Sequence, residues 1–154
     1  MAGYDLHVHT NRSDGTFTPA EAIELATERE LTGVAITDHD TLAGLDDSTA
    51  AAAGRIVLIP GIEFSAEYEG ASLHVLAYWI DPANQDLRAE LKRLTDTRFR
   101  RGELMVEKLQ ELGYPIDFDR VRAIAGGDTI ARPHVAQAMV EAGIVPNEKA
   151  AFTE

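Results

Sequence analysis

The chain has 154 residues, 45% of them hydrophobic, and its 26 acidic and 14 basic side chains give a formal net charge of −12. This size and composition predict a soluble globular protein, and the negative charge argues against binding to long nucleic acids, whose phosphates it would repel. The lack of cysteine excludes disulfides and thiolate metal sites, and no stretch reaches the ~20 apolar residues of a membrane span, so we expect a cytoplasmic protein without membrane contact.

The first half of the chain begins with a strand pattern and a helix pattern. Residues 4–9 alternate polar and apolar side chains, which predicts a strand. Residues 18–21, Thr-Pro-Ala-Glu, carry the signature of a helix start, with threonine as the cap and glutamate reaching back to it. We expect this helix to run to about Leu31 and to be terminated by Gly33.

Alternating patterns continue to residue 79. Strands are expected at 34–38, at 56–67 with a break at Pro60-Gly61, and at 72–79, and a helix is expected at 42–53. The order β-α-β-α-β predicts parallel strands joined by crossover helices, followed by an antiparallel hairpin. After residue 82 the pattern is helical throughout, with helices expected at 86–112, 117–125 and 133–142.

A histidine pair occupies the first predicted strand. His7 and His9 are two residues apart, so their side chains share one face, with Cα atoms roughly 6.6 Å apart. Asp5 lies on that face and is expected to orient the His7 ring, whereas Leu6 and Val8 face the helices. The His-x-His pattern alone fits either a metal site or two structural histidines.

Other histidines and carboxylates accompany the later strands. Asp14 lies in the loop after the first strand, and His39 ends the second strand. Glu63 lies on the third strand and His74 on the fourth. Imidazole and carboxylate together suit Mn²⁺, Fe²⁺ or Zn²⁺ better than Ca²⁺. These side chains and the histidine pair form a candidate set of six metal ligands.

The segments that carry these residues resemble the motifs of the PHP (polymerase and histidinol phosphatase) family. Residues 4–16, Tyr-Asp-Leu-His-Val-His-Thr-x-x-Ser-Asp-Gly-Thr, resemble its first motif, and residues 37–41, Thr-Asp-His-Asp-Thr, its second. Residues 61–65, Gly-Ile-Glu-Phe-Ser, resemble the segment after it, and His74 resembles the histidine of the third motif. The helical half, with Ala-Arg-Pro-His at 131–134, is similar to the branch that acts on nucleotides and short RNA.

The resemblance implies a distorted (β/α)7 barrel that holds two or three divalent ions, Mn, Fe or Zn. It assigns the six ligands to three neighbouring sites: His7, His9 and Glu63 to the first, Glu63 and His74 to the second, and Asp14 and His39 to the third. Asp38 and Asp40 are expected to support the ligands without binding metal themselves.

The resemblance also implies a reaction, the hydrolysis of a phosphate ester with metal-bound water as the nucleophile. The implied substrate is a small phosphorylated molecule, either a nucleoside 3',5'-bisphosphate or a short oligoribonucleotide. The sequence has neither Gly-x-Ser-x-Gly nor Gly-x-x-x-x-Gly-Lys to favour another chemistry. Alternatives are a histidinol-phosphate phosphatase, a polymerase-associated domain, and an inactive metal-binding fragment that needs a partner chain.

Phosphate-binding residues are expected in the helical half. Pro133 begins a helix, so Arg132 lies at a helix N-terminus, where guanidinium and backbone N–H groups can hold a phosphate together. Alternatively, Arg132 caps a neighbouring carbonyl group. His134 either contacts the same phosphate or only packs within the helix.

An apolar stripe along the long helix continues through two arginines. Its apolar members are Leu87, Leu91, Leu94, Met105, Leu109 and Leu112. Arg98 and Arg101 fall on the same face, and we hypothesise that at least one of them points towards the substrate phosphates. Alternatively, the helix bends or the two side chains extend to solvent.

Two domains are expected from these patterns. Residues 1–82 would form the N-terminal part of the PHP barrel with the metal motifs, and residues 83–154 a helical insertion subdomain that binds the substrate phosphates. No Asp-x-His follows residue 79, where the family has its fourth motif, so the C-terminal remainder of the barrel is expected to be absent. The resulting open sheet edge would favour self-association.

Overall fold

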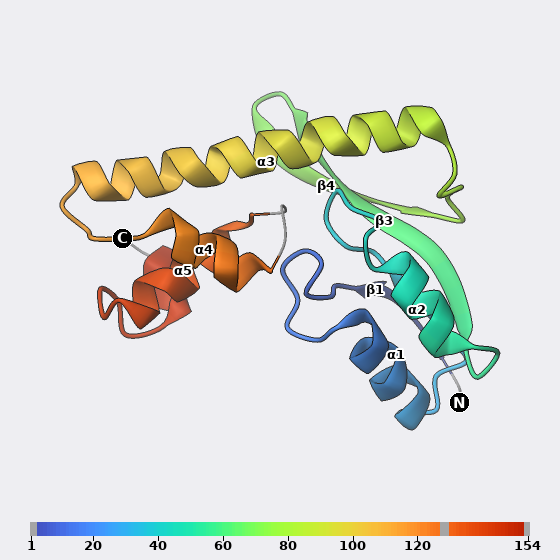
Figure 1. Ribbon diagram of the computed structural model, residues 1–154. Helices are drawn as coiled ribbons and strands as arrows, with labels where there is room; N and C mark the ends of the chain where they lie inside the picture. Colours follow the sequence, from blue (N-terminus) through green and yellow to red (C-terminus); the bar gives the residue numbers. More distant parts are fainter. Residues whose placement is uncertain (1–2, 127–129, 153–154) are drawn as a thin grey trace. The chain divides into compact units, whose positions relative to one another are not determined.

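A sheet of four strands, in the order β1-β2-β3-β4, organises the first half of the chain. The elements here are β1 (Tyr4–Val8), α1 (Pro19–Glu28), β2 (Gly33–Ile36), α2 (Leu45–Ala52), β3 (Val57–Tyr68) and β4 (Ala71–Tyr78). β1, β2 and the start of β3 are parallel, and β4 pairs with β3 in the antiparallel direction. The predicted parallel strands with crossover helices and a final hairpin are therefore confirmed (Figure 1).

The structure is a computed structural model that describes residues 3–126 and 130–152. The chain divides into two compact units, Met1–Leu91 and Lys92–Glu154. The first unit is an α/β structure with a curled sheet, and the second is helical. The two expected domains include residues 1–2, 127–129 and 153–154, which lie outside the described residues.

Helices α1 and α2 pack against each other, with α1 against β2 and α2 against β3, and form the core of the first unit. Its buried side chains are Ala22, Ile23, Ala26, Val34, Ile36, Leu45, Ala52 and Ile56. Val8 of β1 packs against this cluster, as expected. Leu6 is 42% exposed, so its packing against the helices stays a prediction.

Both ends of α1 are determined by local hydrogen bonds. Thr18 accepts the Glu21 backbone N–H at 3.2 Å while the Glu21 carboxylate accepts the Thr18 N–H at 2.8 Å, which confirms the predicted helix start. The helix ends at Glu28, earlier than expected, because the chain reverses at Glu30, whose φ of +54° is left-handed. Gly33 is not the stop but the first residue of β2.

Close packing between strands explains the glycine at position 33. A Cβ atom there would lie 2.5 Å from the Tyr4 ring on the neighbouring strand, so only glycine fits without displacing that ring. α2 also departs from expectation, since it begins at Leu45 and not near residue 42. Residues 42–45 instead form a turn in which the Leu45 N–H donates to the Leu42 carbonyl at 3.1 Å.

Strand β3 is continuous through Pro60-Gly61, where a break was expected. Pro60 is its last residue paired with the parallel strand β2, and Gly61 is its first residue paired with the antiparallel strand β4. A Cβ atom at Gly61 would lie 2.8 Å from Thr37 Cγ2, so glycine allows the neighbouring chain to approach closely. The dipeptide therefore marks a change of partner and not an interruption of the strand.

The second unit contains helices around a core of its own. α3 (Gln85–Glu111) begins in the first unit and continues into the second, where α4 (Phe118–Ala125), α5 (Arg132–Glu141) and the 3-10 helix η1 (Glu148–Phe152) follow. The buried core residues are Val106, Ile116, Val121, Ala125, Ile130, Val135 and Ala138. The three predicted helices are confirmed to within one residue at each end. Within residues 3–126 and 130–152, no helix is both long and apolar enough to cross a membrane.

Replacing Thr18 with Ala should lower the free energy of unfolding by about 1 kcal/mol, because the substitution removes the side-chain acceptor of the α1 cap. The hydrogen bonds from Thr18 also lower the pKa of Glu21, so this carboxylate stabilises the fold above its unfolded pKa and loses that effect as the pH falls through its folded pKa. Urea unfolding at neutral and acidic pH measures both effects. A Thr18→Ser variant, which keeps the acceptor, should resemble the wild type, and equal losses in Ser and Ala variants would contradict the assignment.

Candidate metal centre

The strand ends bring the six predicted ligands into one region. His7 lies in β1 and His9 directly follows that strand, while Glu63 and His74 lie on the paired strands β3 and β4. His39 follows β2 by three residues and forms an isolated parallel bridge with Glu63, so the pairing of the two segments continues beyond the end of the strand. Backbone pairing therefore positions these side chains, as expected where parallel strands end together.

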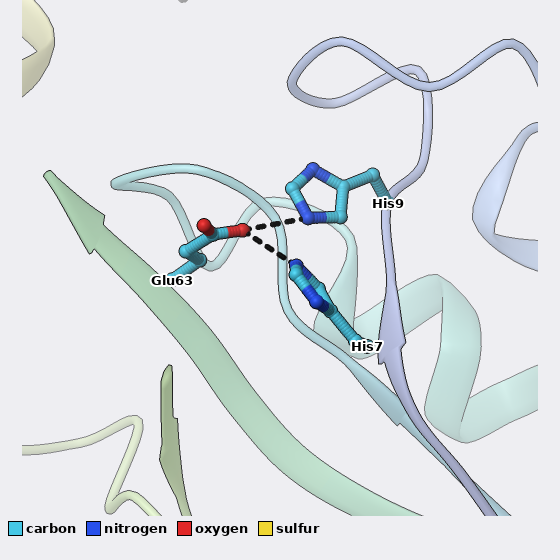
Figure 2. A group of neighbouring side chains, drawn as sticks. All are labelled: His7, His9 and Glu63. Carbon is cyan, nitrogen blue, oxygen red and sulfur yellow. Dashed lines mark hydrogen bonds and ion pairs between the residues drawn. The ribbon is translucent and has the colours of Figure 1, made fainter. Parts of the chain in front are cut away.

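The Glu63 carboxylate lies at the centre of this group. Its Oε2 atom is 2.8 Å from His7 Nε2 and 2.8 Å from His9 Nε2, and Figure 2 shows both rings directed towards this oxygen from β1 and the residue that follows it. Its Oε1 atom is 2.8 Å from His74 Nδ1. Glu63 is only 4% exposed, so its carboxylate depends on the surrounding imidazoles, and not on solvent, for hydrogen bonds.

Asp14 and His39 extend the group on the other side of His9. Asp14 Oδ1 is 2.8 Å from His9 Nδ1, and Asp14 Oδ2 is 3.6 Å from His39 Nε2. His39 is buried, and its Nδ1 atom is 3.8 Å from Glu63 Oε2. Consecutive rings lie close together, with centroids 4.9 Å apart for His7–His9, 4.5 Å for His9–His39 and 4.7 Å for His39–His74.

The proximity of opposite charges shifts two pKa values in opposite directions. Burial lowers the pKa of His9, but its hydrogen bond to Asp14 and the charges of nearby carboxylates outweigh burial and raise the pKa above 6.5. Burial raises the pKa of Glu63, but its hydrogen bond with His7 and the charges of the surrounding histidines lower the pKa below 4.5. Positive charge is therefore favourable among these side chains.

Three overlapping groups have the composition and spacing of metal sites. In each group the donor atoms lie within 4.8 Å of one another, and the groups are His7-His9-Glu63, His9-Asp14-His39 and His39-Glu63-His74. Each pair of groups shares one residue, so three adjacent cations could be bridged by common ligands. Nitrogen and carboxylate donors fit Zn²⁺, Mn²⁺ or Fe²⁺, and the half-exposed His7 and His74 leave the region accessible to solvent.

Asp5 does not contact the His7 ring, as was expected, but the His7 backbone. Its Oδ1 atom accepts the backbone N–H of His7 at 3.2 Å, whereas the His7 ring points to Glu63. The ring is therefore oriented by the buried carboxylate and not by Asp5 as expected. Two residues of the first motif, Thr10 and Ser13, donate hydrogen bonds to the buried carboxylate of Asp38. Residue spacing alone did not predict these hydrogen bonds.

The predicted phosphate-binding residues of the second unit have varied environments. Arg132 lies at a helix N-terminus, as expected, but it is itself the first residue of α5, one position before Pro133, and it is exposed. His134 is buried, and its Nδ1 atom accepts the Ala131 backbone N–H at 3.1 Å, so the ring caps its own helix. A phosphate contact by either residue stays a prediction.

The apolar stripe of α3 is only partly buried. Leu91 is 7% exposed, whereas Leu112, which directly follows α3, is 62% exposed, so burial does not extend to the last member of the stripe. Of the two arginines on the stripe, Arg98 is buried and Arg101 is exposed. The exposure of Arg101 agrees with the alternative that the side chain extends to solvent, and a phosphate contact by either arginine stays a prediction.

A family model for the PHP domain matches residues 5–116. The match covers the segments that carry all six clustered side chains and continues through α3. The chain belongs to the PHP domain family.

Several relatives resemble this chain over nearly its whole length. It is 36% identical to a 3',5'-nucleoside bisphosphate phosphatase from Chromobacterium violaceum over 99% of the chain, and 35% identical to a 5'-3' exoribonuclease from Haemophilus influenzae over 97%. A crystal structure of a candidate metal-dependent phosphoesterase from Bifidobacterium adolescentis matches 99% of the chain with a TM-score of 0.92 and 41% identity. The chain spans 54% of each of these two curated relatives and 55% of the crystallised chain.

In the metal-free chain, the His9 ring should titrate above pH 6.5, and an Asp14→Asn substitution should lower its pKa, because Asp14 supplies the main interaction that raises it. The stabilisation from charged His9 is complete below pH 6.5 and is lost as the pH rises through the raised pKa. Histidine ring shifts followed by NMR in the presence of a chelator measure this pKa, and the resonance missing in His9→Gln gives its assignment. Asp5→Asn is the matched control, and an equal shift in both aspartate variants would contradict the role of Asp14.

Proposed function

We propose that this chain forms the metal-binding half of a phosphoesterase that hydrolyses phosphate esters of small nucleotides or short oligoribonucleotides. The supporting observation is the group of four histidines and two carboxylates, which contains three overlapping candidate metal sites. Two or three divalent ions, Mn, Fe or Zn, would occupy them, held by the six clustered side chains. Bound ions of this kind activate a water molecule and neutralise the charge of phosphoryl oxygens.

The carboxylates and the histidines would have different roles in binding the metal ions and the phosphate. Glu63 belongs to two of the three groups, and its two oxygens face different histidines, so it is suited to bridge two ions. Asp14 supplies the second negative charge on the opposite side of His9. Both carboxylates thus reduce the repulsion between neighbouring cations, while half-exposed His7 and His74 border the side from which a phosphate can approach.

A small substrate agrees with the charge of the chain and with the names of its relatives. A net charge of −12 disfavours long polyanions, whereas a mononucleotide needs only a local positive region. Relatives with about 35% identity are a nucleoside bisphosphate phosphatase and a 5'-3' exoribonuclease, which supports a phosphorylated nucleoside or RNA end as substrate. Arg132, Arg98 and Arg101 are proposed to contribute the phosphate-binding charge from the helical unit.

A second function deserves a separate test, because the chain spans only about half the length of these relatives. The chain could bind metal ions without catalysing hydrolysis unless another polypeptide segment completes the site. Metal binding and turnover are therefore measured separately in the experiments below.

Glu63→Gln should weaken the binding of Mn²⁺ or Zn²⁺ more strongly than the ~10- to 100-fold loss typical of substituting an outer-shell partner of a ligand. The amide keeps the size of the side chain but removes the negative charge shared by two of the candidate sites. Calorimetric titration of the metal-free chain measures the affinity and the number of ions. Glu67→Gln, an exposed glutamate on the same strand, is the matched control and should bind as the wild type does.

Failure of the wild-type chain to bind divalent metal would reject the proposed function. Stoichiometric metal with release of phosphate from a nucleoside 3',5'-bisphosphate, or of nucleotides from a short 5'-phosphorylated RNA, supports the phosphoesterase. Stoichiometric metal without hydrolysis of either compound favours the binding-only alternative.

Arg132→Met should weaken the binding of a nucleoside bisphosphate to the metal-loaded chain by about 10- to 100-fold, since a charged hydrogen bond contributes about 1.5–3 kcal/mol. Equilibrium binding measured by calorimetry makes the test independent of turnover. Arg29→Met, an exposed arginine at the end of α1, should leave the affinity unchanged. The same measurement on Arg98→Met and Arg101→Met tests the hypothesis about α3, and wild-type affinity in all three variants would reject these assignments.

A further inference from the structure

Asp38 and Asp40 flank His39 in the sequence. Asp38 forms hydrogen bonds with the loop of residues 10–14, and Asp40 forms one with strand β3. Asp38 and Asp40 are 2% and 1% exposed, respectively, which is rare for ionisable side chains unless they have strong partners. Among the described residues, neither belongs to any of the three candidate metal groups. Their carboxylates therefore call for an explanation other than metal ligation.

Asp38 anchors the loop that carries Asp14. Its Oδ1 atom accepts the Thr10 backbone N–H and the Ser13 hydroxyl, each at 2.7 Å, and its Oδ2 atom accepts the Thr10 hydroxyl at 2.7 Å. Thr10 directly follows His9, and Ser13 directly precedes Asp14. Both donors are fully buried, so the aspartate holds the loop at the residues adjacent to two candidate ligands.

Asp40, in contrast, is hydrogen-bonded to strand β3. Its Oδ1 atom accepts the Ser65 N–H at 2.8 Å, and its own N–H donates to the Glu63 carbonyl at 3.0 Å. The Glu63 N–H in turn donates to the Asp38 carbonyl at 3.3 Å. Asp40 has a left-handed φ of +53°, which aspartate tolerates better than most residues and which turns the chain after His39.

We infer that Asp38 and Asp40 are positioning residues that fix the spacing of the metal ligands, one for the loop of residues 10–14 and the other for strand β3. The inference rests on the proposed function, because it concerns the same six side chains. His39 lies between the two aspartates, so one three-residue segment supplies a ligand and holds the backbone of ligands on both sides. Neighbouring ions require ligand atoms at fixed separations, which a mobile loop would not maintain.

The two aspartates act on different segments, and this difference separates a positioning role from a general contribution to stability. Loss of the Asp38 carboxylate removes three hydrogen bonds to the loop and none to β3. Loss of the Asp40 carboxylate removes the hydrogen bond to Ser65, whereas the loop keeps its contacts with Asp38. A merely structural role would loosen the whole first unit in either case.

Amide hydrogen exchange of the complete metal-free chain, measured by NMR, tests this difference. The Gly15 amide, which donates to the Thr10 carbonyl, reports on the loop, and the Glu63 amide, which donates to the Asp38 carbonyl, reports on β3. Neither amide is bonded to a substituted side chain. Asp38→Ala should accelerate exchange at Gly15 by about tenfold or more and leave Glu63 unchanged, and Asp40→Gly should have the reverse effect. Glycine adopts the left-handed conformation readily, so Asp40→Gly removes the carboxylate without straining the turn.

Metal affinity provides the functional measurement. Both variants should weaken Mn²⁺ or Zn²⁺ binding by about 10- to 100-fold while the amides of α1 exchange as in the wild type. Asp38→Asn and Asp40→Asn, which keep one acceptor oxygen, should lie between the wild type and the truncated variants. This graded recovery is expected of residues that act through hydrogen bonds.

These measurements distinguish a positioning role of the two aspartates from a general contribution to stability. Equal acceleration at Gly15, Glu63 and the α1 amides would overturn the inference, because it indicates global destabilisation. Wild-type exchange in both segments would also overturn it, whether metal binding is retained or lost. A wild-type chain that binds no metal rejects the proposed function alone, since hydrogen exchange still determines whether each aspartate holds its own segment.

Discussion

The buried carboxylate of Glu63 is the feature on which the arrangement of this site depends. An isolated carboxylate at 4% exposure would be unfavourable by several kcal/mol, and here three imidazole nitrogens at 2.8 Å compensate it. His74 comes from the neighbouring strand β4, whereas His7 and His9 come from β1 and the residue after it, so one carboxylate joins segments that are distant in the sequence. Without it, His7, His9 and His74 would have no common acceptor.

The strand that carries Glu63 can reach this position because it changes partners. Parallel pairing with β2 ends at Pro60, and antiparallel pairing with β4 begins at Gly61. Glu63 therefore lies beyond the end of β2, where the chain that follows β2 still pairs with it through His39. The change of partner places His74 of β4 on one side of the carboxylate and the histidines of the β1 segment on the other.

The sequence predicted these features to different degrees, for physical reasons. Strand alternation and the His-x-His spacing depend on local geometry, so the parallel strands and the shared direction of His7 and His9 followed directly. The role of Gly33 and the continuity of β3 through Pro60 depend on which strands are neighbours, and residue patterns within one segment do not contain that information. The same limit applies to Leu6, whose exposure depends on what covers the sheet, and to Leu112 at the end of α3. Residues bound through side-chain networks, such as Thr10 and Ser13, were inside a recognised motif but had no assigned partner.

His9 explains why the site is suited to cations. Its two ring nitrogens each lie 2.8 Å from a carboxylate oxygen, one of Asp14 and one of Glu63. A neutral imidazole has only one N–H to donate, so in this geometry the second nitrogen faces a carboxylate with its lone pair unless a proton or a metal ion lies between them. The raised pKa of His9 is the response to this environment when no metal is present. Protons and divalent cations thus compete for the same positions, so binding of a cation would release the proton.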